Sequence, residues 1–363
     1  QNKQLDYGFS FHGFNTDFGF ENNFGASFQQ RDFTTELIGY AKYRQVLGRL
    51  VIEPGLRLHF YASQPELSFE PRLGVKYGIA DWLRVRAAGG FYSQNLVSTV
   101  NEQDVVNFFV GFLAGPQETI FRPGTRTPTE SRLQKSIHGV LGWEVDLSRR
   151  TGLTVEGYYK RFTQLISLNR NKRNGADPDF MTETGDAYGV DLSARHQGER
   201  LYLWLTYSLG YVFRDDGEQR YPAVFDRRHT VNLLASYRFG KRRTWEAGLR
   251  WNLGSGFPFT QTQGFFQNVP FVDDKIRPDV RTGNFDLGTI LSETRNGGRL
   301  PWYHRLDLSV KKNLELSRYG RLEVEATVTN AYDRANVFFV DRLTDQTVRQ
   351  LPILPSLGLT LVF

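Results

Sequence analysis

The last eight residues, SLGLTLVF (356–363), form the most regular alternating segment of the chain. Successive side chains of an extended strand point to opposite faces, so the three leucines and Phe363 share one face and Gly358 and Thr360 lie on the other. An ordinary soluble domain usually leaves a frayed polar tail instead. What this strand means depends on whether the rest of the chain repeats its pattern.

The same period of two recurs almost everywhere, and helical periodicity is convincing nowhere. The segments RTWEAGLRWNL (243–253) and RLEVEATVT (321–329) show it most clearly. Their alternation assigns Leu249, Leu322 and Val324 to an apolar face, and Arg250, Glu323 and Glu325 to a polar face. We predict about 14 strands, at 5–14, 33–46, 49–62, 67–77, 81–92, 132–147, 151–165, 184–197, 199–214, 227–240, 242–256, 301–315, 319–332 and 353–363.

The connections between these strands alternate between short and long. Tight turns are expected at Leu47-Gly48, GIA (78–80), RRT (149–151), Gly198, Lys241 and SRY (317–319). Most of the other connections are long, at 15–32, 93–131, 166–183, 257–300 and 333–352, and only 63–66 is short. Short turns at one end and long loops at the other are the plan of an outer-membrane β-barrel, with the short turns on the periplasmic side.

A soluble β-sandwich is the main alternative, because its strands also alternate. Sandwich strands average five or six residues, whereas these run about 10 to 16 residues, and about 9 to 11 cross a bilayer at a tilt. A hydrated barrel lumen also tolerates the charges on the polar faces, which a packed core would not. The expected lumenal residues are Arg57, Arg72, Arg84, Arg86, Glu156, Arg195, Arg250, Arg305, Asp307, Glu323 and Glu325.

The composition agrees with this fold class, an all-β transmembrane antiparallel barrel. The chain has 363 residues, a mean hydropathy of −0.44 and no apolar run long enough for a transmembrane helix. No segment reads as a signal peptide. Cysteine is absent, which suits an oxidising compartment. The net charge of +6 is mild for this length and gives little support to nucleic-acid binding.

Aromatic residues make up 14% of the chain, and outer-membrane barrels place such residues in girdles at the two membrane interfaces. We expect Phe363 at the periplasmic interface, because a terminal Phe after an alternating strand resembles the signal that presents outer-membrane proteins to the assembly machinery. Five tryptophans are candidates for the same belts, against ordinary packing as the alternative: Trp82, Trp143, Trp245, Trp251 and Trp302.

A series of segments points to a particular family. They are IEPGLRLHFYA (52–62), EPRLGVKYGI (70–79), AAGGFYSQNLVST (87–99), ETGDAYGVDLSARH (183–196), LYLWLTYSLGYV (201–212), FDRRHTVNLLASYRFG (225–240), WNLGSGFPFTQTQG (251–264), RLPWYHRLDLSVKK (299–312) and VTNAYDRANVFFVDR (328–342). In this order they resemble the barrels of TonB-dependent outer-membrane receptors, of the kind abundant in Bacteroidetes. The resemblance covers nearly the whole chain.

The resemblance also implies features that this sequence does not contain. The family has a 22-stranded barrel filled by an N-terminal plug domain, and a short segment ahead of the plug contacts TonB. We therefore expect residues 1–363 to be the C-terminal portion of the barrel, with about eight strands and the plug lying outside this numbering. In that case 5–14 will not pair with 353–363, whereas a complete 14-stranded barrel would join them.

No pattern of reactive residues predicts an enzyme, a metal site or a cofactor. The six histidines are scattered without metal-ligand spacing, and no nucleophile and base are arranged together. GSGFPF (254–259) superficially resembles a phosphate loop but precedes no helix. NRNKRNGADPDF (169–180) has the residue types of a calcium loop, although ordinary turn chemistry is the favoured interpretation.

Two long loops are the candidate recognition regions. Loop 93–131 contains the apolar run VVNFFVGFLAG (105–115), which would be sticky if exposed, and loop 257–300 is rich in Phe among Gln and Asn. The apolar run could fold into the barrel mouth, cover the plug or dock a partner lipoprotein. Alternatively, both loops could be strand extensions that stand above the membrane. The candidate contact residues are Phe108, Phe109, Phe112, Phe257, Phe259, Phe265 and Phe266.

The resemblance implies an energy-coupled importer in the cell outer membrane for a scarce, large solute, such as a siderophore complex, a corrinoid, an oligosaccharide or a peptide. Its partners would be outer-membrane lipid, TonB through the N-terminal region outside this chain, and a surface lipoprotein. The alternative is a structural barrel subunit of a larger outer-membrane complex for secretion or surface-protein handling. A complete 14-stranded channel like the long-chain fatty-acid porins is a weaker third hypothesis.

Overall fold

A computed structural model describes residues 2–21, 27–99, 111–169, 172, 176–267, 271–272, 275–276, 287–316 and 320–363. Strands form all the regular structure of these residues. They are β1 (Lys3–Glu21), β2 (Ser27–Leu47), β3 (Leu50–Tyr61), β4 (Glu66–Ala80), β5 (Leu83–Gln94), β6 (Val97–Ser98), β7 (Phe112–Leu113), β8 (Gln134–Ser148), β9 (Thr151–Leu168), β10 (Phe180–Gln197), β11 (Leu201–Asp215), β12 (Arg220–Pro222), β13 (His229–Phe239), β14 (Trp245–Gly254), β15 (Pro258–Phe259), β16 (Thr262–Gln267), β17 (Phe271–Val272), β18 (Lys275–Ile276), β19 (Leu287–Leu291), β20 (Gly298–Arg299), β21 (Tyr303–Glu315), β22 (Arg321–Thr329), β23 (Val337–Val340), β24 (Thr347–Arg349) and β25 (Leu354–Val362).

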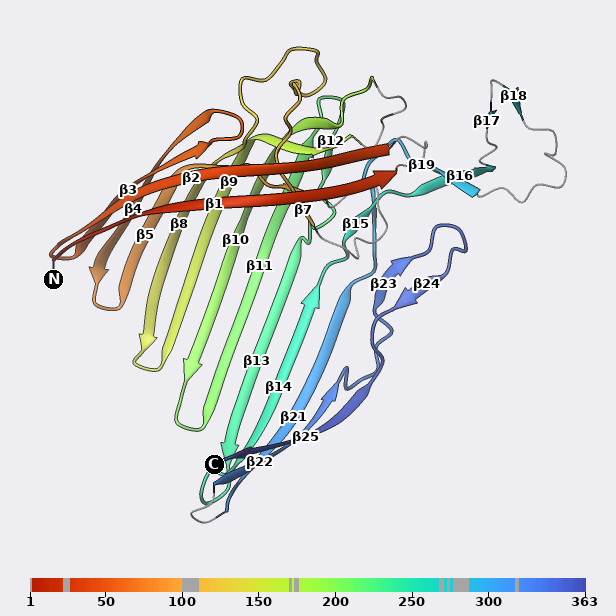
Figure 1. Ribbon diagram of the computed structural model, residues 1–363. Coiled ribbons are helices and arrows are strands. Elements are labelled where there is room, and N and C mark those ends of the chain that lie inside the picture. The colour runs from red at the N-terminus through yellow and green to blue at the C-terminus, as the bar shows by residue number, and fades with distance from the viewer. Residues whose placement is uncertain are drawn as a thin grey trace.

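The long strands form one antiparallel sheet in chain order, β1-β2-β3-β4-β5-β8-β9-β10-β11-β13-β14-β21-β22-β25, with the short β12 paired to β11. These fourteen strands match the predicted ones closely. Short turns join them at one end of the sheet, which we call the short-turn end, and longer loops join them at the long-loop end (Figure 1). Within the described residues, no helix is long and apolar enough to cross a membrane.

Two predicted connections are wrong in detail. Most of the loop expected at 15–32 is strand, because β1 and β2 stay paired as far as Glu21 and Ser27. The ladder needs only an antiparallel neighbour, so it continues after the apolar alternation weakens. The turn expected at GIA (78–80) lies later, at Asp81-Trp82, because β4 runs to Ala80.

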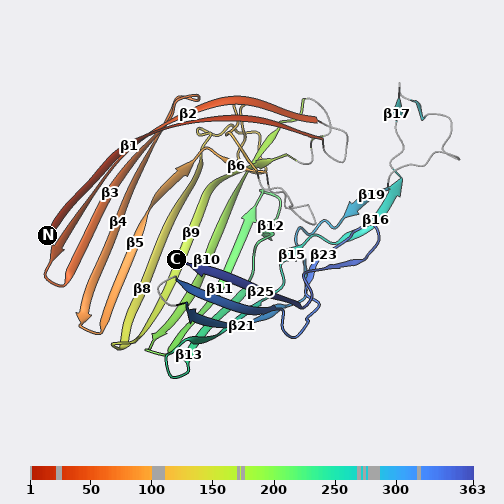
Figure 2. The ribbon, with the colours of Figure 1, turned by 60° about the horizontal axis from the view of Figure 1, so that its bottom comes forward.

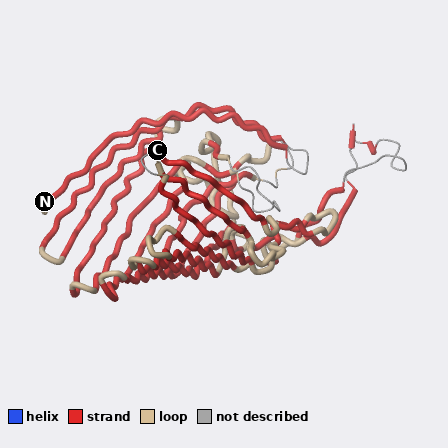
Figure 3. Tube along the Cα trace, turned by 90° about the horizontal axis from the view of Figure 1, so that it is seen from below, coloured by secondary structure: helices blue, strands red, loops and turns tan. Residues whose placement is uncertain are grey.

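The sheet is strongly curved, so one face is concave (Figures 2 and 3). Its two edge strands are β1 and β25, and among the described residues each pairs with a single neighbour, β2 and β22. The expected absence of pairing between 5–14 and 353–363 is therefore confirmed. Every residue of β25 is exposed.

The register puts the predicted apolar and polar residues on opposite faces of the sheet. Leu249 lies opposite Leu308, and Val324 lies between Lys312 and Leu359. On the other face Glu323 forms an ion pair with Lys311 at 3.7 Å. The apolar face carries large exposed side chains, such as Tyr7 and Phe9 on β1. A contiguous apolar surface of this kind is what a lipid-facing wall requires.

Ion pairs cross the strands of the polar face, which we call the lumenal face. Glu144 on β8 accepts from Lys76 at 2.7 Å and from Arg84 at 3.1 Å, and Arg86 joins it to Glu156 on β9. These contacts span four strands from β4 to β9. Mutual pairing offsets the cost of holding so many charges on one face of the sheet.

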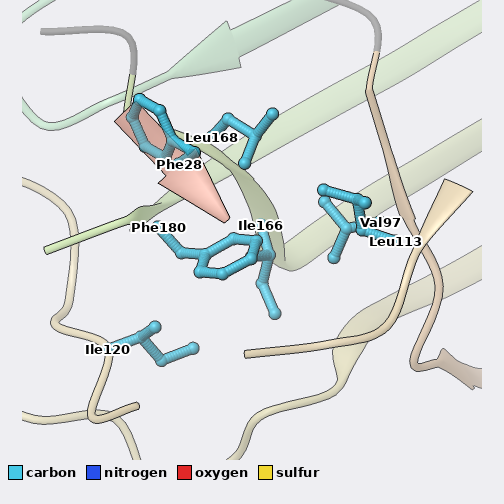
Figure 4. Packing of buried hydrophobic residues seen from close by; sticks show 7 residues of the cluster. All are labelled: Phe28, Val97, Leu113, Ile120, Ile166, Leu168 and Phe180. Atoms are coloured by element: carbon cyan, nitrogen blue, oxygen red, sulfur yellow. The ribbon is translucent and has the colours of Figure 1, made fainter. Parts of the chain in front are cut away.

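A small hydrophobic core lies at the long-loop end (Figure 4). It consists of Phe28, Val97, Leu113, Ile120, Ile166, Leu168 and Phe180. These residues come from β2, β9, β10 and the connection between β5 and β8. Segments far apart in the sheet are therefore tied together at the mouth of the concave face.

Candidate functional site

Residues 95–99 and 111–133, the described part of the connection between β5 and β8, lie at the mouth, and we call this connection the inner loop. It is anchored by polar contacts on both sides of the concavity. The Gln30 side-chain amide donates to the Ala114 carbonyl at 3.3 Å, and Gln117 donates to Asp32 at 2.7 Å. On the far side, the Phe180 backbone N–H donates to Glu118 at 2.9 Å. The inner loop therefore bridges β2 and β10.

The apolar run of the inner loop is partly buried. Leu113 is 2% exposed and Ala114 is fully buried, whereas the neighbouring Phe112 is 59% exposed. The described part of this run therefore packs its buried Leu113 into the small core at the mouth. The candidate residues Phe108 and Phe109 lie outside the described residues.

The contact between Glu118 and Phe180 is partly buried, and this burial changes the protonation of Glu118. Burial raises the pKa of the Glu118 carboxyl, and the N–H donated by Phe180 opposes that rise only partly. The proton-bound form is thus favoured more strongly in the folded loop than in an unfolded chain.

The connection between β14 and β21, residues 255–302, is the second long loop, and we call it the outer loop. Its base is fixed by hydrogen bonds around Asn296, which donates to the Pro222 carbonyl at 2.8 Å and whose N–H donates to Thr260 at 3.0 Å. Beyond this base, β16 and β19 pair as a hairpin that stands away from the main sheet (Figures 1 and 2).

The four candidate phenylalanines of the outer loop therefore fall into two places. Phe265 and Phe266 are exposed on the β16–β19 hairpin. Phe259 lies in β15, opposite Gly298, and Phe257 lies at the base of the loop against Arg227. The structure brings neither pair together with Phe112 into one cluster.

An aromatic and basic band runs across the lumenal face below the inner loop. The Arg72 guanidinium lies 4.3 Å from the centre of the Tyr92 ring, and Tyr92 stacks on His138 with the ring centres 4.2 Å apart. His138 contacts Phe162 edge-on at 6.3 Å, and the Lys160 ammonium lies 5.6 Å from the Tyr158 ring. These aromatic residues are not among the site residues predicted from the sequence. They occupy the same alternate positions as the polar residues of their strands, and that pattern could have identified them.

A buried polar network supports one end of this band. Glu70, which is almost fully buried, accepts from Arg57 at 2.6 Å, from Arg72 at 2.7 Å and from the Ser93 hydroxyl at 2.6 Å. His59 lies 3.3 Å from Glu36 through its Nε2 atom. These contacts fix the side chains of β2 to β5 at the level of the mouth.

Other predicted features have structural roles or stay unassigned. Among the described residues, no three His, Asp or Glu side chains are grouped to hold a metal ion. In the 169–180 segment, Lys172 pairs with Asp179, and Asn169 donates to the Pro178 carbonyl at 2.9 Å, which is turn chemistry. Phe363 is 99% exposed beside the edge strand β25, and its role in assembly stays a prediction.

Comparisons with known proteins agree with this architecture. The chain superposes on the ferripyoverdine receptor of the outer membrane of Pseudomonas aeruginosa (TM-score 0.60, 13% identity, 91% of this chain and 39% of that chain). It also superposes on the FrpB iron transporter of Neisseria meningitidis (0.58, 13%, 91% and 45%) and on the ferric-catecholate import receptor Fiu of E. coli K12 (0.60, 12%, 92% and 45%). The chain thus spans less than half of the length of each. A search of curated proteins finds no match.

The family comparison is more direct than these distant superpositions. The model described as TonB dependent receptor-like, beta-barrel matches residues 1–331. That range contains the mouth, the lumenal band and thirteen of the fourteen strands in the path of the main sheet. Because the match covers most of the sequence, the chain belongs to the TonB-dependent receptor β-barrel family.

Proposed function

We propose that this chain forms part of the barrel wall of an energy-coupled import receptor, and that a scarce, large solute binds at the mouth. The family gives the outer membrane as its location. The observation that carries the proposal is the inner loop, whose described residues bridge β2 and β10 at the long-loop end, above a charged lumenal face. Such a mouth fits selective capture of a solute better than free diffusion.

The proposal also assigns roles to further parts of the receptor that lie outside this chain. The open edges of β1 and β25 carry backbone groups that lipid cannot satisfy, so each edge needs a partner in the membrane. We propose that further strands and a plug complete a larger barrel, with this chain as its C-terminal portion. TonB would act on that plug region. A Bacteroidetes source and a surface lipoprotein partner belong to the same proposal.

Recognition is proposed to involve both long loops. Phe112, Phe265 and Phe266 are exposed aromatics at the long-loop end, where an incoming solute or lipoprotein arrives. Phe257 and Phe259 lie nearer the wall, at the base of the outer loop. The neighbouring Phe108 and Phe109 are included on sequence grounds.

The test is uptake by cells that carry the full-length receptor. A labelled panel of a ferric siderophore, a corrinoid, an oligosaccharide and a peptide is offered with and without a protonophore and with and without TonB. Import of one panel member that needs both the receptor and TonB is expected. Receptor-independent uptake of the whole panel, with stable co-purification of secretion components, would instead favour the structural-subunit alternative.

A further inference from the structure

One arginine at the mouth is held in place by aromatic rings and a backbone carbonyl. Arg227 precedes β13, and its guanidinium lies 4.4 Å from the centre of the Phe257 ring and 5.2 Å from that of Tyr303. Its Nε donates to the Ser255 carbonyl at 3.0 Å. Aromatic faces attract a cation, and the backbone contact fixes the plane of the fork.

The neighbouring strand is shaped around this side chain. A Cβ atom at Gly254 would lie 2.4 Å from the Arg227 Cζ and Nε atoms, so a larger residue there would displace the guanidinium from this position. Gly254 pairs with Tyr303 in the sheet and shares the lumenal face with Arg250. The guanidinium therefore lies on the lumenal side of β14 and β21.

The acid next to Arg227 in the sequence already accepts hydrogen bonds from other groups. Asp226 is fully buried, and its Oδ1 accepts from the Val212 N–H at 2.8 Å. Its Oδ2 accepts from Arg228 at 2.8 Å and from Arg299. Among the residues that the structure describes, no carboxylate forms an ion pair with Arg227. Burial accordingly lowers the pKa of the Arg227 guanidinium.

We infer that Arg227, held beside the rings of Phe257 and Tyr303, receives an oxyanion of the transported solute, a carboxylate, phosphate or catecholate group. This inference rests on the proposed function and narrows its substrate class to anionic solutes. A half-buried cation without a counter-ion has lost hydration that an incoming oxyanion replaces. The terminal nitrogens of an arginine fork suit two oxygens of one such group, and the flanking rings favour a planar attachment beside it.

The binding test uses the purified full-length receptor and phenyl phosphate as the probe, with benzyl alcohol as its neutral counterpart. Calorimetry at low salt should detect phenyl phosphate but not benzyl alcohol. Arg227→Gln should weaken phenyl phosphate binding by about 10- to 100-fold, because charge-assisted hydrogen bonds are lost, and Arg227→Lys should fall between. The melting temperature of each variant shows whether it is folded.

Arg195→Gln is the matched control. Arg195 is also on the lumenal face and lies 5.5 Å from the Tyr202 ring, but it belongs to the short-turn half of β10. Its loss removes the same charge and should leave phenyl phosphate binding unchanged. Equal weakening by Arg195→Gln and Arg227→Gln would overturn the inference, as would absence of phenyl phosphate binding to the wild-type receptor. Because binding needs no TonB, failure here is distinguishable from failure of uptake.

Discussion

The inner and outer loops both contain apolar and aromatic residues, but they lie in different surroundings. The inner loop bridges the mouth and buries Leu113 in a small core, whereas the outer loop projects the β16–β19 hairpin with Phe265 and Phe266 exposed. The difference lies in what surrounds them. Polar groups on β2 and β10 form hydrogen bonds with the backbone and side chains of the inner loop. In the outer loop, the described hydrogen bonds around Asn296 lie at its base.

This comparison indicates that anchoring, rather than aromatic content, decides which loop becomes part of the wall. A loop can enter a barrel mouth only if its backbone groups find partners there. The predictions below test that conclusion, beginning with the base of the outer loop.

The largest effect is expected at Asp226, which holds Arg228 and Arg299 near the base of the outer loop. Asp226→Ala leaves the partly buried guanidinium groups of Arg228 and Arg299 without their ion-pair partner. We expect a loss of about 3–5 kcal/mol of stability at the long-loop end, measured by denaturant unfolding and proteolysis of that region. Glu293→Ala, an exposed residue in the same loop, should have little effect. Equal sensitivity of the two variants would refute this anchoring.

The next effect concerns the core of the inner loop. Leu113→Ala should cost about 2–5 kcal/mol of local stability, because it leaves a cavity among Phe28, Val97 and Ile166. Faster hydrogen exchange in 111–133 would report it. The adjacent Phe112→Ala is the control, since that side chain is exposed. If Phe112→Ala loosens the loop as much as Leu113→Ala does, the inward packing is wrong.

A smaller effect is expected from pH at the inner-loop anchor. The raised pKa of Glu118 means that the folded loop binds a proton more tightly than the unfolded chain does. This contribution is fully present below the unfolded pKa and is lost as pH rises through the folded pKa. Protection factors of the inner loop, which are exchange rates corrected for the intrinsic pH dependence of amide exchange, should therefore be higher near pH 4 than near pH 7. Glu118→Gln should remove most of the difference, and a wild-type loop that loosens on acidification would contradict the sign.

The smallest effect on stability is expected at the outer hairpin. The double variant Phe265→Ser and Phe266→Ser should change unfolding by about 0.5 kcal/mol or less, because both side chains are exposed. Uptake or partner binding should nevertheless fall, since the hairpin is proposed to carry recognition. Deletion of 261–271 should abolish it while the barrel still assembles. Unchanged uptake after that deletion would remove the hairpin from the recognition surface.

Much of the fold could be predicted from the sequence, because period-two alternation and turn residues act locally. Examples are the strand that ends at Phe363 and the alternating charged residues Glu323 and Glu325 of β22. The fate of the loops could not be predicted, because it depends on partners such as Gln30 and Glu118 that are distant in sequence. Arg227 was missed for the same reason: its aromatic neighbours and the space at Gly254 come together only in the folded sheet.

The central claim, that the alternation separates a lipid face from a lumenal face, has a direct test. Residues 1–363 contain no cysteine, so Val324→Cys and Glu325→Cys each introduce one thiol into this part of the receptor, on adjacent residues of β22, and the parent receptor without either substitution gives the background labelling. With a membrane-impermeant, polar thiol reagent on the assembled receptor, we predict that position 325 is labelled and position 324 is protected by lipid. Equal labelling, or labelling of position 324 alone, would contradict the register and the barrel wall built on it.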